Sequence, residues 1–288
     1  MMAHASVQDK KNKVKSKISW VLAIILAVFW LIIAFVPFFF MVISGFKQKL
    51  ETILYGAFHW PEKFYPDNYI SILTDPSFWN YFKNSVIVIV ISLTILLMIA
   101  AFAAYPLSRF QFKMRGFIYL LIVACMSIPM HVTLIPVFQM SINTGLYDSL
   151  WALIPTNVAF ALPLSVFILT GFMKGIPKEL EEAADIDGCG RFRRFWQIIL
   201  PLSTPGLSTL GIYNGVNMWN EFIFAFTLTQ KEENRTLPLA LWNYQGAYSS
   251  NTAMIMACLS LSVLPMIILF CILQDKLVKG MMAGAVKG

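Results

Sequence analysis

Five long stretches of this sequence carry neither lysine nor arginine, and their length limits the possible folds more than any other feature. These stretches are residues 18–46, 84–108, 116–173, 197–230 and 236–275. A helix crosses a bilayer with about 20 apolar residues, and a lysine or arginine within it is costly. The third stretch is long enough for two crossings and breaks at the polar turn 143–148, whereas the fifth is continuously apolar only over 253–274. The sequence therefore predicts an all-α membrane protein with six transmembrane helices.

The composition agrees with a bilayer as the main solvent of the chain. Of its 288 residues, 58% are hydrophobic and 13% are charged, and the mean hydropathy is +0.68, which excludes an ordinary soluble domain. The net charge of +7 accompanies no basic patch interleaved with aromatic residues, so we expect contact with membrane lipid and none with nucleic acid. The four cysteines form no CxxC pair, and neither a metal site nor a disulfide framework is expected.

The distribution of positive charge predicts the orientation in the membrane. With the N-terminus inside, the cytoplasmic segments hold 16 of the 22 lysine and arginine residues, so both termini are expected in the cytoplasm. The expected order is a cytoplasmic N-terminal tail, a first transmembrane helix, an outer loop, a core of five further helices and a cytoplasmic C-terminal tail. Their respective bounds are 1–17, 18–46, 47–80, 81–275 and 276–288. In the outer loop, the pairs Trp60-Pro61 and Tyr65-Pro66 predict turns rather than a helix.

The largest hydrophilic segment between predicted spans, 174–198, contains a short predicted helix. Pro177 suits its first turn, acidic residues lie toward its positive N-terminal end, and Gly188 supplies a stop. Anionic lipids at the inner surface would repel the acidic run, and the small side chains of Ala183-Ala184 would let another backbone approach. We therefore expect this helix to dock on a protein partner. The alternative is an amphipathic loop that anchors the bundle to lipid headgroups.

The spacing around this helix makes the segment specific. Glu182-Ala183-Ala184 is followed after three residues by Gly188, after nine more by Ile198 and, one residue later, by Leu200-Pro201. This pattern resembles the EAA signature of permease subunits of bacterial binding-protein-dependent ABC importers. Further segments resemble the carbohydrate branch of that family, and within it the shorter permease of maltose-type, multiple-sugar and raffinose-type oligosaccharide transporters. These segments are residues 128–129, 134–136, 145–148, 219–222 and 279–288.

The resemblance implies a type I ABC importer permease fold in the bacterial cell membrane, and a role in transport rather than in bond chemistry. In that family the loop with the motif is the coupling helix, which docks on a cytoplasmic ATPase, and a tail of small residues enters the ATPase dimer interface. Carried over by position, the coupling residues are Glu182, Ala183, Ala184, Gly188, Ile198, Leu200 and Pro201. The tail residues are Ala283, Gly284, Ala285, Val286, Lys287 and Gly288.

The resemblance also implies the partners. They are a homologous second permease subunit, two ATPase subunits, an extracytoplasmic solute-binding protein and a sugar, expected to be an oligosaccharide. The chain has no GxxxxGK[ST] phosphate loop, so ATP and magnesium are expected on the separate ATPase and no cofactor on this chain. The alternatives are an importer for a non-sugar solute, a passive channel, which would not need an acidic docking loop, and an intramembrane enzyme, which would need catalytic groups beside Glu221.

Polar residues within the predicted spans are candidates for a solute path. They are Asn157, Asn214, Asn217, Asn220 and Glu221. An intramembrane acid marks a functional site by default, yet Glu221 could equally be solvated at the outer surface, and amides also hydrogen-bond helices to one another. In the loop 230–251, the candidates for contact with the solute-binding protein are Arg235, Trp242 and Tyr244. In maltose-type systems the longer permease makes most sugar contacts, so the resemblance does not require a sugar site here.

Overall fold

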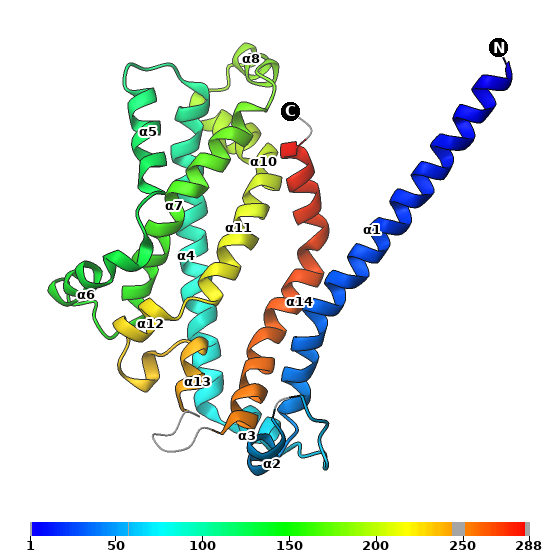
Figure 1. Cartoon of the computed structure of the whole chain (residues 1–288). Helices are drawn as coiled ribbons and strands as arrows, with labels where there is room; N and C mark the ends of the chain where they lie inside the picture. Colours follow the sequence, from blue (N-terminus) through cyan, green and yellow to red (C-terminus); the bar gives the residue numbers. More distant parts are fainter. Residues whose placement is uncertain (1, 57, 244–250, 286–288) are drawn as a thin grey trace. The chain divides into compact units, whose positions relative to one another are not determined.

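The computed structural model describes residues 2–56, 58–243 and 251–285, and these residues form helices and connecting loops without a strand. The chain divides into two compact units (Figure 1). One unit contains the chain up to residue 72 together with 245–261, and the other contains 73–244 and the chain from 262 onward. The last helix, α14 (Thr252–Ala285), continues from the first unit into the second.

In the first unit, side chains of one short helix hold the end of the first long helix. The helices here are α1 (Met2–Ser44), α2 (Lys49–Tyr55) and α3 (Asp67–Thr74). The Nδ2 group of Asn68 donates to the carbonyl oxygens of Gly45 and Lys47, each at 2.8 Å. The hydroxyl of Tyr69 donates to the carbonyl oxygen of Val42 at 2.8 Å. A Cβ atom on Gly45 would lie 2.5 Å from that hydroxyl oxygen, so a residue without a side chain is needed there.

The helices at the two ends of the chain are longer than the predicted transmembrane segments. Helix α1 runs without interruption through the predicted junction of tail and first transmembrane helix, and α14 continues to Ala285 where a tail was predicted. The side chains from 19 to 37 are exposed, as expected of a surface that lipid covers. The prediction of turns without a helix in the outer loop is wrong, because α2 and α3 lie within it. Pro61 and Pro66 fall between these helices, where they interrupt no helical hydrogen bond.

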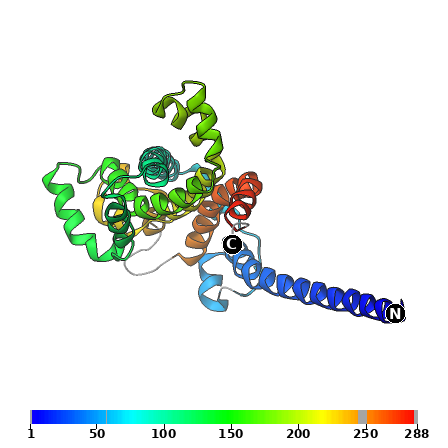
Figure 2. The same ribbon diagram turned by 90° about the horizontal axis from the view of Figure 1, so that it is seen from above.

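The second unit is organised around a pair of long helices, α4 (Pro76–Arg109) and α7 (Leu150–Lys174). Figures 1 and 2 both show the cyan ribbon of α4 alongside the green ribbon of α7. Small buried residues of α4 face larger buried residues of α7, so the two backbones approach closely. The residues of this interface include Ala100, Ala101, Ala104, Val166, Leu169 and Met173. The core of the unit lies along this seam.

The described residues contain four uninterrupted helices that are long and apolar enough to cross a membrane. They cover residues 19–44, 76–109, 150–174 and 252–272. Helix α5 (Arg115–Cys125) and the segment Met130–Asn143 are together long and apolar enough to cross, but they meet at 88°. If this bent pair forms one span, a fifth crossing is present. The second segment consists of the 3₁₀ helix η1 (Met130–Thr133) and α6 (Leu134–Asn143). Pro129, which has no backbone N–H to donate, stands at the break.

The remaining predicted crossing, within 197–230, belongs to a series of short helices that begins before it. In chain order they are α9 (Arg191–Arg194), the π-helix η2 (Phe195–Ile199), α10 (Leu200–Leu202), α11 (Thr204–Trp219) and α12 (Ile223–Leu228). Pro201 and Pro205 lack the N–H that would bond to an earlier carbonyl, which accounts for the widened and interrupted helix around them. The all-α membrane fold is therefore confirmed, with four or five crossings by length and composition among the described residues, and the crossing predicted for 197–230 is divided.

Asp148 connects the turn before α7 to the loop that follows α12. The same end of the second unit contains η3 (Glu232–Asn234), η4 (Leu237–Leu239) and α13 (Ala240–Asn243). The Oδ1 atom of Asp148 accepts the backbone N–H groups of Gln230 at 2.8 Å and Lys231 at 2.9 Å. Burial alone would raise the pKa of this carboxyl, but these two donors, the amide of Asn234 and the Lys231 ammonium together hold its pKa below the ordinary value. The charged form of Asp148 therefore stabilises the contact between the loops.

We expect Asp148→Ala to loosen this loop pair by about 2 kcal/mol, because two backbone N–H groups lose a charged acceptor. Hydrogen exchange at the amides of Gln230 and Lys231 measures the effect. Asp148→Asn is the matched control, since it keeps an acceptor oxygen and tolerates the positive φ of 58° at this position. Equal exchange in all three proteins would contradict the role given to the carboxylate.

The same contact predicts a dependence on pH. The pKa of Asp148 is lower in the folded protein, so its stabilising contribution is complete above the unfolded-state pKa and is lost as the pH falls through the folded-state pKa. Protection of the two amides, corrected for intrinsic exchange, should therefore persist down to about pH 4 and decline below it. A decline that begins near neutral pH would point to another titrating group.

Candidate functional site

The segment predicted as a short docking helix forms α8 (Glu179–Ile186), and a Schellman motif ends it. The N–H of Gly188 donates to the carbonyl of Asp185 at 3.0 Å, and the N–H of Cys189 donates to the carbonyl of Ala184 at 2.8 Å. These are the two bonds that define this type of helix end, and it requires a positive φ, which is +71° at Gly188. The predicted glycine stop is therefore confirmed.

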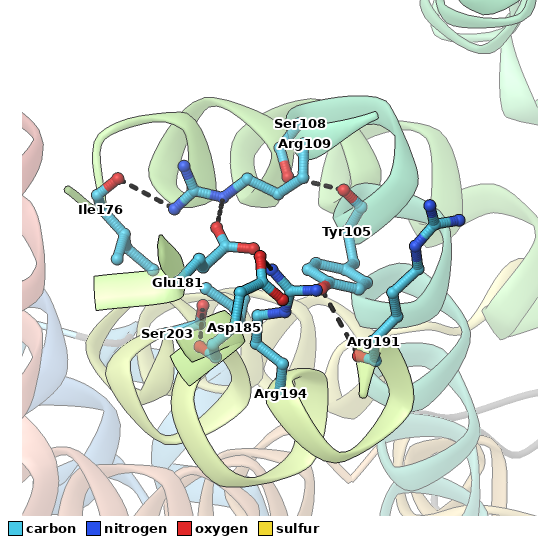
Figure 3. A network of polar contacts seen from close by, with 10 residues as sticks. Tyr105, Ser108, Arg109, Ile176, Glu181, Asp185, Arg191, Arg194 and Ser203 are labelled. Carbon is cyan, nitrogen blue, oxygen red and sulfur yellow. Dashed lines mark hydrogen bonds and ion pairs between the residues drawn. The ribbon is translucent and has the colours of Figure 1, made fainter. Parts of the chain in front are cut away.

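Two ion pairs fix α8 to the rest of the second unit (Figure 3). The Nε atom of Arg109, the last residue of α4, lies 2.7 Å from Oε1 of Glu181, and these side chains are only 4% and 10% exposed. The same guanidinium donates to the carbonyl oxygen of Ile176 at 2.9 Å. Arg194 of α9 lies 2.6 Å from Oδ2 of Asp185. A bonded network thus connects the long helix α4, the loop before α8, α8 itself and the helix that follows.

This network corrects the prediction that the acidic run as a whole faces a partner. Glu181 and Asp185 face arginines of their own chain, and Ala184 is buried, so Ala183-Ala184 does not form one exposed surface. The opposite face carries Glu182, Ala183 and Ile186, which are exposed.

Two residues of this site, Arg109 and Ile186, are not among the predicted site residues. In the sequence Arg109 contributes to the charge bias, and a single arginine at the end of a long apolar run is also a natural partner for a nearby acid. Ile186 is 87% exposed. Its position between two aspartates in a polar segment indicates a contact surface, because an exposed apolar side chain is stabilised only when a partner covers it.

The remaining residues of the predicted motif belong mostly to the core of the bundle. Ile198 and Leu200 pack, half-buried, against the cluster that contains Phe195 and Ile199, whereas Pro201 is exposed. Their spacing from Gly188 therefore reflects how the chain returns from α8 into the bundle rather than a second free surface.

The five residues predicted for a solute path come together in the structure. Asn157, Asn214, Asn217, Asn220 and Glu221 all line one cavity of about 670 Å³ within the second unit. Its walls come from η1, α7, α11 and the connection from α11 to α12, which begins after α11 ends at Trp219. Binding pockets of proteins commonly have about this volume.

Hydrogen bonds within the chain orient these polar groups. The Nδ2 groups of Asn217 and Asn220 donate to the carbonyl oxygens of Tyr213 and Val216 on their own helix, each at 2.9 Å. Asn214 is buried, and its Nδ2 group bridges from α11 to Ser165 of α7. One of the amides therefore joins two helices, and all four line the cavity.

Glu221 serves as a helix cap. Its two carboxylate oxygens accept the N–H groups of Phe224 at 2.7 Å and Ala225 at 2.9 Å, in the first turn of α12. Carboxylates suit this position because the first N–H groups of a helix lack internal partners. The acid is thus fixed by backbone donors while it lines the cavity.

The predicted contact residues of the outer loop and the predicted tail are only partly within the described residues. The guanidinium of Arg235 donates to the carbonyl oxygen of Gln230 at 3.4 Å, and Trp242 lies in α13. Tyr244 and the tail residues Val286, Lys287 and Gly288 lie outside the described residues, whereas Ala283, Gly284 and Ala285 form the end of α14. No group of three or more metal-ligating side chains occurs in the part of the chain that the structure describes.

We expect Arg109→Ala to destabilise the attachment of α8 by about 3–5 kcal/mol, because it leaves the buried carboxylate of Glu181 without its partner. Thermal unfolding of the purified chain in detergent and hydrogen exchange in α8 measure the effect. Arg193→Ala is the matched control, since Arg193 is exposed and donates to Gln197 in the same helical segment. The double variant Arg109→Met, Glu181→Met should recover part of the loss, and a purely additive double variant would contradict the pairing.

Comparisons with known proteins agree with this architecture. Residues 96–283 match the family described as "Binding-protein-dependent transport system inner membrane component". The chain is 49% identical to a putative ABC transporter permease protein, ORF2, of Caldicellulosiruptor sp. over 90% of this chain and 94% of that protein. It is 32% identical to the arabinooligosaccharides transport system permease protein AraQ of Halalkalibacterium halodurans over 96% of this chain and 100% of that protein.

A solved structure shares the fold. It is a chain of a bacterial ABC transporter involved in the import of the acidic polysaccharide alginate, with a TM-score of 0.74 and 22% identity over 88% of this chain and 94% of that chain. The family match spans most of the chain, including α8 and the residues that line the cavity. This chain is a multi-pass membrane protein that belongs to the family of binding-protein-dependent transport system inner membrane components.

Proposed function

We propose that this permease subunit carries a sugar, in the form of an oligosaccharide, that an extracytoplasmic solute-binding protein delivers. The observation that supports the sugar is the cavity between α7 and α11, where four asparagines and a glutamate gather among apolar and aromatic residues. Such a mixture suits a solute with many hydroxyl groups and apolar ring faces. The similarity to an arabinooligosaccharide permease supports the same class of solute.

The proposed complex also contains a second permease subunit and two ATPase subunits, which hold ATP and magnesium, while this chain holds no cofactor. The exposed face of α8, with Glu182, Ala183 and Ile186, is proposed as the contact with the ATPase. A short helix with an exposed isoleucine between acids fits a groove that is apolar in its floor and basic at its rim. Arg235, Trp242 and Tyr244 remain proposed contacts of the solute-binding protein.

The ion pairs of α8 suggest how the movement of an ATPase would reach the membrane. Because Glu181 bonds to Arg109, a displacement of α8 pulls on the end of α4 directly. Asp185 bonds to Arg194, which leads through η2 into α11. Both α4 and α11 pack in the core of the second unit, and α11 lines the cavity. The inner face of α8 thus transmits the movement that its outer face receives.

We expect Glu182→Lys to abolish ATPase capture and ATP-dependent uptake in proteoliposomes that contain the complete importer, because it reverses the charge of the docking face. Gly188→Val should have a similar effect, since a β-branched residue at a positive φ costs about 1–2 kcal/mol, although its Cβ would meet no atom of this chain. The measurements are retention of the ATPase during purification and uptake of radiolabelled oligosaccharides.

Matched controls separate docking from folding. Glu62→Lys makes the same charge reversal at an exposed acid outside both α8 and the loop 230–251, and Gly188→Asn tolerates the left-handed backbone, so both should retain most of the uptake. Normal uptake with Glu182→Lys and Gly188→Val would refute the coupling role of α8. Solute flux without ATP through the unaltered complex would indicate a passive channel instead.

The proposed orientation places both termini and α8 in the cytoplasm. A variant whose sole cysteine is Cys189, which is half-exposed, should resist an impermeant maleimide in intact cells and react in inside-out vesicles. Thr144→Cys in a cysteine-free background is the control, because the exposed turn that contains it should show the reverse pattern. Reaction of Cys189 in intact cells would overturn the orientation.

A further inference from the structure

The hydrogen-bonding character of the cavity is set by the way its amides are held. Asn217 and Asn220 each turn their nitrogen toward a carbonyl oxygen four residues earlier in the same helix. Only the nitrogen of a carboxamide can donate to a carbonyl, so the oxygen of each side chain is turned away from the helix backbone. Both side chains are exposed and line the cavity. Their oxygens therefore present hydrogen-bond acceptors to a bound solute.

The charge of the cavity adds to this acceptor character. Glu221 is the one carboxylate among the described lining residues, and its two oxygens are fixed by the N–H groups of Phe224 and Ala225. Each carboxylate oxygen has a further lone pair beyond the one that a backbone donor uses. Neither lysine nor arginine is found among the described residues of the lining, and the other ionisable groups there are His131 and Tyr213. A negatively charged solute would thus meet the Glu221 carboxylate with neither a lysine nor an arginine to balance it, and with His131 as the basic side chain of the lining.

The apolar part of the wall is suited to the ring faces of a sugar. Phe160, Tyr213 and Phe222 line the cavity from α7, α11 and the connection to α12. Flat side chains of this kind pack against the C–H faces of a pyranose, while its hydroxyl groups, which can donate hydrogen bonds, meet the acceptors. The two kinds of surface that a neutral sugar presents therefore both have a counterpart.

We propose that this cavity binds uncharged sugar units through the acceptor oxygens of Asn217, Asn220 and Glu221, and that Glu221 makes this permease discriminate against sugars that carry carboxylates. This inference rests on the proposed function, since it names the class of sugar that the same subunit carries. Glu221 is the specificity-determining residue, and the aromatic side chains are positioning surfaces for the rings.

The test is a protection experiment on the complete importer, with the four native cysteines of this chain replaced by alanine. Ala161→Cys places a small reporter thiol in the cavity lining, and Thr144→Cys places one in an exposed turn outside it. The rate of alkylation by N-ethylmaleimide is measured with neutral di-, tri- and tetrasaccharides and with oligouronates of equal length, at constant ionic strength. At least one neutral sugar should slow alkylation at the Ala161→Cys site threefold or more, uronates should slow it less than 1.5-fold, and the Thr144→Cys site should be unaffected.

Two variants then test the cause of the discrimination. Glu221→Gln removes the charge and should raise protection by uronates at least threefold, whereas Glu233→Gln, which removes an exposed charge outside the cavity, should not. Hydrogen exchange at the amides of Phe224 and Ala225 reports whether α12 stays folded in Glu221→Gln. Asn217→Lys leaves Glu221 and α12 untouched and should likewise admit uronates, because it adds a basic counterpart.

Each outcome decides between the two proposals. Equal protection by neutral sugars and uronates, or no gain with either variant, would overturn the role of Glu221. ATP-dependent import of a neutral sugar that never protects the Ala161→Cys site would overturn the binding cavity and leave the proposed function standing. Import of uronates in preference to neutral sugars would overturn the solute class inferred here, and the absence of ATP-dependent import of any sugar would overturn the proposed function itself.

Discussion

The packing of α4 against α7 is the interaction on which the rest of the second unit depends. Alanines on α4 let the two helices approach closely over the seam that contains Leu169 and Met173. In a membrane the hydrophobic effect cannot drive helices together, so close contact and a few hydrogen bonds must do so. At 1.5 Å per residue, the 34 residues of α4 extend about 50 Å. This helix therefore reaches both ends of the unit.

Each end of α4 bonds to a loop. Toward its N-terminal end, the Nδ2 group of Asn84 donates to the carbonyl oxygens of Glu233 and Arg235 at 2.8 and 2.9 Å. At its C-terminal end, Arg109 pairs with Glu181. A buried pair of opposite charges adds little net stability, yet it is costly to break by the loss of one partner. Such a pair defines where α8 sits, which matters more for a docking helix than the energy of the contact.

The irregular part of the chain, from α9 to α12, creates the polar cavity. In a continuous helix Asn214, Asn217 and Glu221 would share one face, because they are spaced three and four residues apart. The break after Trp219 leaves the first N–H groups of α12 without helical partners, and Glu221 caps them while it lines the same cavity as the amides. Irregular backbone at membrane depth persists where its polar groups are satisfied or line a cavity, and both conditions are met here.

The sequence alone determined the features that depend on local chemistry. Apolar length indicated the long helices, the glycine at 188 indicated a helix stop, and the motif from Glu182 to Pro201 indicated the family. Only the tertiary structure decided how those residues are used. It turned Glu181 and Asp185 inward to Arg109 and Arg194, left Ile186 exposed, and brought Asn157 of α7 to the same cavity as Glu221. Local sequence patterns determine whether a segment is helical and where the helix ends. The face of the helix that packs depends on residues far away in the chain, and the spacing within the segment contains no information about them.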